Sequence, residues 1–197
     1  MVPHLEQLCS DAGANEVNGT ALDLSRVDDV GNSLLDKLRV AMRQEQSANL
    51  FFLHRDSDER DHRPRRRQIH AAIDANSPSV PCVAVVPVQE TEAWLLLDET
   101  AIRRAAANPR GRVSLNLPLP SAVERLARPK EFLQGTLITA SEHTGRHLDR
   151  FKAQFGTQRR TLLEQLPIGG PLEQVDSWIR LRADIRAALA PKITIEN

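Results

Sequence analysis

The sequence contains no tyrosine, and aromatic residues make up only 4% of its 197 positions. A surface of aromatic rings that stacks the bases of single-stranded nucleic acid is therefore not expected, and aliphatic side chains must build the core. There are two cysteines, Cys9 and Cys82, which lie in apolar surroundings without a CxxC spacing. This pattern predicts two reduced core thiols and no disulfide or zinc site.

The chain also lacks an excess of either charge, since 26 basic residues balance 26 acidic ones. This balance excludes a uniformly basic nucleic-acid binder but leaves room for a local basic patch. No segment reaches the roughly 18 consecutive apolar residues that a membrane span needs, and the N-terminal residues do not resemble a signal peptide. We therefore expect a cytoplasmic protein without membrane contact.

The first half of the chain predicts an α/β domain. Two short apolar runs, 48–54 and 81–88, have the length and composition of strands buried on both faces of a parallel sheet. Between them a polar loop opens a helix with Pro64 in its first turn, which makes a right-handed βαβ unit. Helices are also predicted over 3–12 and 28–44, and a short edge strand over 16–24.

The second half predicts helices only. Residues 90–107 read as two helical pieces, and the proline-rich segment 108–121 is the best candidate for a boundary. Helical spacing follows over 121–128, 129–141, 145–155, 157–166 and 172–189. The expected organisation is an α/β domain over 1–107, with a mostly parallel sheet flanked by helices, and an all-α extension over 108–197 that packs on it.

Two acidic residues, Asp56 and Asp58, come directly after the first predicted strand. Ligands of open α/β sheets bind outside the carboxyl ends of the strands, and residues two apart in an extended segment point to the same side. Two converging carboxylates repel each other unless a cation lies between them, and Mg²⁺ or Mn²⁺ prefers such oxygen ligands. Asp61 would add a third oxygen or cap the next helix. The alternative is that these acids are solvated loop residues.

A second acidic pair, Glu90 and Glu92, follows the second predicted strand. If the strands are parallel neighbours, both pairs lie at the same edge of the sheet, and four acids would hold one or two metal ions. Alternatively, Glu92 opens a helix, whose dipole favours an acid there. Trp94 is expected in the core.

A run of arginines follows the first acidic pair. Arg60, Arg65 and Arg66 are candidates for binding phosphate groups beside a metal ion, through paired hydrogen bonds. The alternative is a solvated helix face.

The segments HRDSDERD and VPVQETEAWLLLDETAIRRAAANPRGR, together with LPLP and RPKEFL further on, carry a family resemblance. They resemble an uncharacterised bacterial TOPRIM-like family, related to the TOPRIM domains of OLD-type nucleases and often found in phage-defence or ATPase-linked gene pairs. The similarity extends over about residues 3–190, and ETEAWLLLDE and NPRGR are its most specific parts.

The resemblance implies a TOPRIM-like, Rossmann-like fold with a Mg²⁺-dependent phosphoryl-transfer site. Asp56 and Asp58 would be the acidic pair of the family, and Glu92, with Glu90, its later acid. TOPRIM domains also place a catalytic glutamate after a first strand. The sequence starts inside the helix that would follow that strand, and neither Glu6 nor Glu16 matches the position.

Two functions of different classes follow from these features. The first is a metal-dependent nuclease that acts on DNA or RNA in phage defence, with Asp56, Asp58 and Glu92 as catalytic residues. The second is a non-catalytic or regulatory partner subunit of an ATPase, which uses the helical half for docking. A nucleotide-binding enzyme that transfers phosphate is a third alternative, and a homodimer is a further expected assembly.

Overall fold

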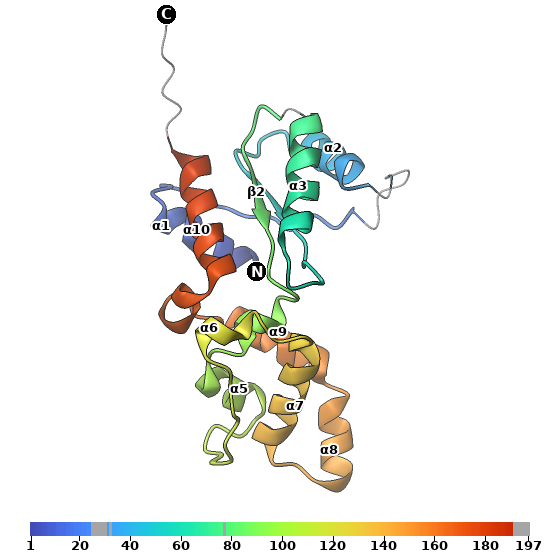
Figure 1. Cartoon of the computed structure of the whole chain (residues 1–197), viewed down its shortest axis with the longest axis vertical. Coiled ribbons are helices and arrows are strands. Elements are labelled where there is room, and N and C mark those ends of the chain that lie inside the picture. The colour runs from blue at the N-terminus through green and yellow to red at the C-terminus, as the bar shows by residue number, and fades with distance from the viewer. Residues whose placement is uncertain (25–30, 32, 77, 191–197) are drawn as a thin grey trace, which may run out of the picture. The chain divides into compact units, whose positions relative to one another are not determined.

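The structure is a computed structural model that describes residues 1–24, 31, 33–76 and 78–190 (Figure 1). Over these residues the chain is α/β, with a two-stranded parallel sheet and many helices. It divides into two compact units. The sheet unit comprises Val2–Arg55, Arg63–Val86 and Arg180–Asn197, and the helical unit comprises Met1, Asp56–His62 and Pro87–Ile179.

The predicted βαβ element is confirmed. Strand β1 (Phe51–His54) pairs in parallel with β2 (Cys82–Val85), in a register that sets Phe51 opposite Cys82. Helix α3 (Arg63–Asn76) connects them and contains Pro64 in its first turn, where the missing backbone N–H of proline costs nothing. Both strands are shorter than the apolar runs that predicted them.

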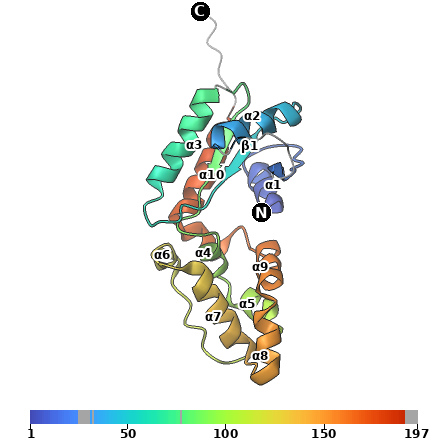
Figure 2. The same ribbon diagram turned by 90° about the vertical axis from the view of Figure 1, so that its right-hand side faces the viewer.

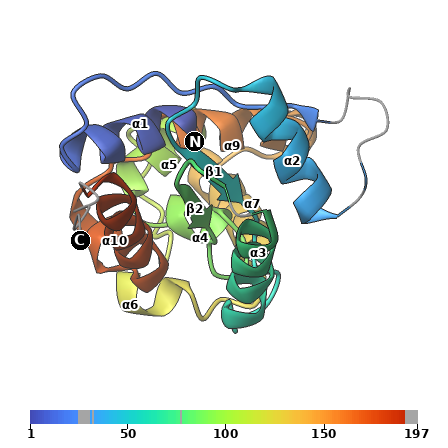
Figure 3. The same cartoon turned by 90° about the horizontal axis from the view of Figure 1, so that it is seen from above.

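Helices cover both faces of the sheet. Helices α2 (Leu34–Gln44) and α3 lie on one side of the strands, and α1 (Val2–Asp11) and the sheet-unit part of α10 (Asp176–Leu189) lie on the other (Figure 3). Helix α2 begins where it does because the Ser33 side chain accepts a hydrogen bond from the Asp36 backbone N–H at 3.1 Å, which satisfies one donor of the first turn.

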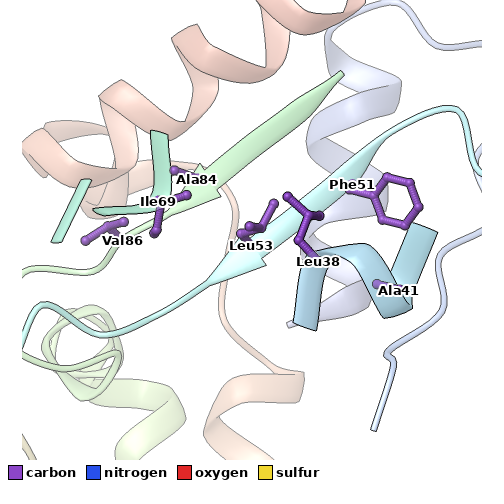
Figure 4. Packing of buried hydrophobic residues seen from close by; sticks show 7 residues of the cluster. All are labelled: Leu38, Ala41, Phe51, Leu53, Ile69, Ala84 and Val86. Atoms are coloured by element: carbon purple, nitrogen blue, oxygen red, sulfur yellow. The ribbon is translucent and has the colours of Figure 1, made fainter. Parts of the chain in front are cut away.

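The core of the sheet unit lies between the strands and the pair α2 and α3. Side chains from these four elements meet there, with Ile69 of α3 completely buried against the strands (Figure 4). The members of the cluster are Leu38, Ala41, Phe51, Leu53, Ile69, Ala84 and Val86. Every one is aliphatic except Phe51, as the scarcity of aromatic residues requires.

The edge strand predicted over 16–24 is wrong for the residues that follow α1. Residues 16–23 have no regular secondary structure. The Gly19 backbone N–H donates to Glu6 Oε1 at 2.7 Å, and a Cβ at Gly19 would lie 2.8 Å from the Val2 side chain. The segment therefore contacts α1 at Gly19 and does not form a strand. Of the helix predicted over 28–44, residues 28–30 and 32 lie outside the described part.

The Cys9 thiol gives a testable consequence of burial in α1. It is 3% exposed, and burial, together with the charge of Glu6, raises its pKa. The native thiol thus stays protonated at pH values at which the thiol of the unfolded chain ionises. The thiol's contribution to the free energy of unfolding is complete below the ordinary thiol pKa. It is lost as the pH rises from that value through the raised pKa of the native thiol. In a Cys82→Ser variant at pH 8, we expect iodoacetamide to modify Cys9 at least about tenfold more slowly in the native than in the urea-unfolded chain. Equal rates, measured by mass spectrometry, would contradict this placement.

The helical unit confirms the prediction of an all-helical second half. Its helices are α4 (Glu92–Leu95), α5 (Glu99–Ala105), α6 (Pro120–Val123), α7 (Pro129–Ser141), α8 (Gly145–Lys152) and α9 (Phe155–Glu164), with the 3₁₀ turn Gly170–Gln174 and the start of α10 (Figure 2). Helix α6 is shorter than the predicted 121–128. Pro129 accounts only for the non-helical backbone of Arg128, because proline disfavours helical backbone in the residue before it.

Two buried tryptophans pack against each other in the core of the helical unit. Trp94 of α4 and Trp178 of α10 are both buried, and their rings meet edge to face with centroids 5.1 Å apart. Trp94 Nε1 donates to Ser177 Oγ at 3.0 Å. The prediction that Trp94 is a core residue is confirmed. Among the described helices, none has the length and apolar character needed to cross a membrane.

Candidate metal and phosphate site

The backbone beyond the strands brings the two acidic segments together. The parallel pairing continues past the end of β1, since the Ser57 N–H donates to Pro87 O at 3.2 Å and the Asp58 N–H to Gln89 O at 3.0 Å. The buried Ser57 side chain adds a bond, because its Oγ accepts from the Gln89 N–H at 2.7 Å and donates to Glu59 O at 2.6 Å. Residues 56–58 therefore run beside residues 87–89, as two parallel strand ends must.

Asp56 is anchored to the second acidic segment. Its Oδ1 accepts a hydrogen bond from the Thr91 backbone N–H at 3.0 Å and another from Thr91 Oγ1 at 2.8 Å. Thr91 immediately precedes Glu92, the first residue of α4. The half-buried Asp56 carboxylate is thus held next to the start of α4 by two hydrogen-bond donors of one residue.

Asp58 does not continue the extended path. Its φ is 61°, a left-handed conformation that aspartate tolerates better than most residues. The expectation that Asp56 and Asp58 point to the same side assumed extended backbone through both residues, and that condition ends at Ser57. Asp58 is exposed, as is Asp61 in the same loop.

Glu92 is the most buried of the predicted acids. Its side chain is 5% exposed, and its Oε1 lies 2.5 Å from Nε of Arg159, whose side chain is 33% exposed. Arg159 belongs to α9, which packs against α4. Removing a carboxylate from water is costly unless a cation and hydrogen bonds compensate for it, so Arg159 accounts for the burial of Glu92.

Glu90 has a role at the start of a different helix. Its Oε2 accepts a hydrogen bond from the Lys130 backbone N–H at 2.8 Å. Lys130 is the second residue of α7, and backbone N–H groups at this position have no partner inside their helix. Glu90 therefore caps α7 from another element, and this bond ties the segment after β2 to the helical unit's longest helix.

The described acids offer few ligands to a metal ion. Within the described ranges, no group of three His, Cys, Asp or Glu side chains is arranged to hold a metal ion. Mg²⁺ that works with phosphate substrates usually takes only one or two protein carboxylates and completes its coordination with water and phosphate. Asp56 binds Thr91, the residue that precedes Glu92, so Asp56 and Glu92 are the two candidates for such ligands.

The predicted phosphate-binding arginines lie in both units. Arg66 of α3 forms an ion pair with Asp184 of α10 at 3.0 Å, and Arg65 Nη1 donates to Gln68 Oε1 at 2.9 Å. Both belong to the sheet unit, whereas Arg60 is exposed in the loop of the helical unit. Arg66 therefore has a structural partner on the sheet unit's C-terminal helix.

Sequence reasoning missed the residues that hold the acids. Thr91 and Ser57 anchor the two segments, but a threonine and a serine in polar loops carry no distinctive signal. Arg159 lies 67 residues beyond Glu92, and its helix gives no indication of a buried partner. Comparison with protein-family models, curated proteins and solved structures finds no match for this chain.

Proposed function

We propose that this chain is a Mg²⁺- or Mn²⁺-dependent phosphoryl-transfer enzyme of TOPRIM-like fold, a cytoplasmic nuclease that acts on DNA or RNA in phage defence. The observation that carries the proposal is the pair of hydrogen bonds from Thr91 to Asp56. These bonds hold an acid from the end of β1 beside the acid-bearing start of α4. Ligands of open α/β sheets bind beyond the carboxyl ends of the strands, and Asp56 follows β1 in the chain, which supports the proposal.

In this proposal, Asp56 and Glu92 would hold the cation, whereas Asp58, Asp61 and Glu90 are acids predicted for the site that the structure does not bring into a metal-holding group within the described residues. A bound Mg²⁺ would neutralise charge on a phosphate oxygen and make water a better nucleophile. The protein's own contribution is to fix the ligands. Thr91 orients Asp56, and Arg159 holds Glu92 in its buried position. Arg60 would attract phosphate from the exposed loop.

An Asp56→Asn variant tests the role of this carboxylate. Asparagine keeps an oxygen that accepts from Thr91 but loses the negative charge that attracts a cation. We expect Mg²⁺-dependent cleavage of single- or double-stranded DNA or RNA to fall by about a hundredfold or more. The free energy of unfolding should change by less than about 1 kcal/mol, since the Thr91 bonds are retained.

The matched control is Asp149→Asn, which removes the charge of an exposed acid on α8. It should cleave like the parent chain, and EDTA should abolish cleavage by both. Cleavage that survives Asp56→Asn, or that is indifferent to EDTA, would rule out this mechanism.

The alternative function is a non-catalytic partner subunit of an ATPase. A specific observation favours it, because Glu90 and Glu92 both have structural partners, Lys130 N–H and Arg159. In that case the chain would bind no Mn²⁺ by calorimetry and would co-elute with a partner ATPase. Binding of Mn²⁺ that is lost in Asp56→Asn would favour the enzyme.

A further inference from the structure

Gln89 has a strained backbone at the end of the segment that follows β2. Its φ is 63°, and the Glu90 N–H donates to Val88 O at 2.9 Å. A hydrogen bond across one residue with positive φ is the rarer and more strained form of the γ-turn. Glutamine has no preference for this conformation, which glycine and asparagine adopt more readily. Strain of this kind concentrates at active sites and ligand clamps, where the surrounding structure enforces it.

Two hydrogen bonds from the segment after β1 enforce this turn. The Gln89 N–H donates to Ser57 Oγ at 2.7 Å, and the Gln89 carbonyl accepts from the Asp58 N–H at 3.0 Å. Both backbone groups of Gln89 are therefore fixed, and the whole residue is only 8% exposed. The paired strand ends thus determine where the Gln89 side chain begins.

The side-chain amide of Gln89 has no hydrogen-bond partner among the described residues. Neither Oε1 nor Nε2 belongs to the completely covered polar atoms that lack a partner, so solvent reaches both. Polar groups of a nearly buried residue are costly to leave without hydrogen bonds. A strained residue whose amide keeps both its donor and its acceptor unpaired is arranged for a ligand rather than for the stability of the fold.

The two unpaired groups of the amide select the chemistry of the ligand. A phosphate oxygen would satisfy only Nε2 and would bring negative charge toward Oε1 and the neighbouring acids. A trans peptide group has its N–H and C=O on opposite sides of the bond, where one amide cannot reach both. Adenine presents its N6–H donor and its N7 acceptor side by side, and it is the only base that does so in the major groove. Glutamine pairs with both groups of adenine at once.

We propose that the Gln89 side-chain amide binds the edge of an adenine base, with Nε2 donating to N7 and Oε1 accepting from N6–H. The adenine belongs either to a nucleic acid, in which case the inference rests on the proposed function, or to a free adenine nucleotide. Gln89 is a binding residue in this scheme and takes no part in breaking bonds. Its backbone bonds to Ser57 and Asp58 place it at the acidic strand ends.

The test compares adenine with 7-deazaadenine, which has a carbon in place of N7. The parent chain and Gln89→Leu are titrated with a duplex oligonucleotide in EDTA, followed by fluorescence anisotropy, and with AMP, followed by calorimetry. Each ligand is used in its adenine and its 7-deazaadenine form. We expect the parent to bind the adenine form about tenfold more tightly. Gln89→Leu keeps an apolar stem but lacks the amide, so it should bind both forms equally.

Two further variants separate ligand binding from folding and cover the case in which Gln89→Leu does not fold. Gln89→Asn suits the positive φ better, but its shorter side chain draws the amide back by one methylene group. Its urea midpoint should be no lower than that of the parent, whereas the preference for adenine should be lost. Gln165→Leu changes an exposed glutamine just after α9 and should retain the preference.

The outcomes separate this inference from the proposed function. Equal binding of both forms by the parent, or a preference that survives in Gln89→Leu, would overturn the inference. If the parent cleaves nucleic acid but shows no preference for adenine, only the role of Gln89 is overturned. A preference seen with AMP alone supports that role, assigns the base to a free nucleotide and counts against the nuclease. Binding of neither ligand overturns the inference, and the Asp56→Asn cleavage assay then decides the proposed function separately.

Discussion

Replacing Trp178 by alanine is expected to lower the free energy of unfolding by about 3–5 kcal/mol, the usual loss for a fully buried aromatic side chain. Trp178 has no exposed surface, and its ring packs edge to face on Trp94, a contact that adds roughly 0.5–1.5 kcal/mol beyond burial. Truncation leaves a cavity between α4 and α10 that the surrounding helices can fill only in part. Urea denaturation followed by circular dichroism measures the loss.

Ile179→Ala is the matched control for this prediction. Ile179 is the next residue of α10 and is 47% exposed. Its truncation should lower the free energy of unfolding by only about 0.5 kcal/mol, well under the loss expected at Trp178. Trp178→Phe should retain most of the stability, because Nε1 of Trp178 donates to no acceptor among the described residues. Equal losses for Trp178→Ala and Ile179→Ala would contradict this core.

The second large effect is expected at the buried ion pair, measured without metal. Arg159→Gln should lower the free energy of unfolding by about 2–3 kcal/mol, since it leaves the Glu92 carboxylate buried without a cation. Glu92→Gln should cost only about 1 kcal/mol, because the Arg159 side chain that loses its partner is a third exposed and water can solvate it.

The double variant Glu92→Gln with Arg159→Gln checks that the two losses share one cause. With no buried charge left, it should be more stable than Arg159→Gln alone, which reveals the coupling between the two sites. Urea titrations in EDTA give all four values. If the two single losses simply add, or if Glu92→Gln is the more damaging change, the ion pair is not what keeps Glu92 buried.

The local elements of this chain could be predicted because their causes lie close together in the sequence. The apolar run that contains Phe51 and Leu53 is too short for a buried helix, and it forms β1. Pro64 and Pro129 both stand in the first turn of a helix. The edge strand predicted over 16–24 was wrong because alternation of residue types does not reveal that Glu6 binds the Gly19 N–H.

The candidate site was predicted in outline and missed in its contacts. Parallel pairing of two strands places the segments after them side by side, so the proximity of Asp56 and the start of α4 followed from the order of the elements. The direction of Asp58 did not follow, because its positive φ depends on the turn that leads into the loop. Metal binding at this edge stays a prediction.

Sequence alone determined where the strands and most helices form, which face of each is apolar, and that acids follow both strands. These properties depend on residues a few positions apart, whose spacing the backbone geometry fixes. Only the tertiary structure decided that Glu92 is buried, that Arg159 neutralises it and that Glu90 caps α7. Such partners are chosen by the packing of helices far apart in the chain, where charge must be matched after water is excluded.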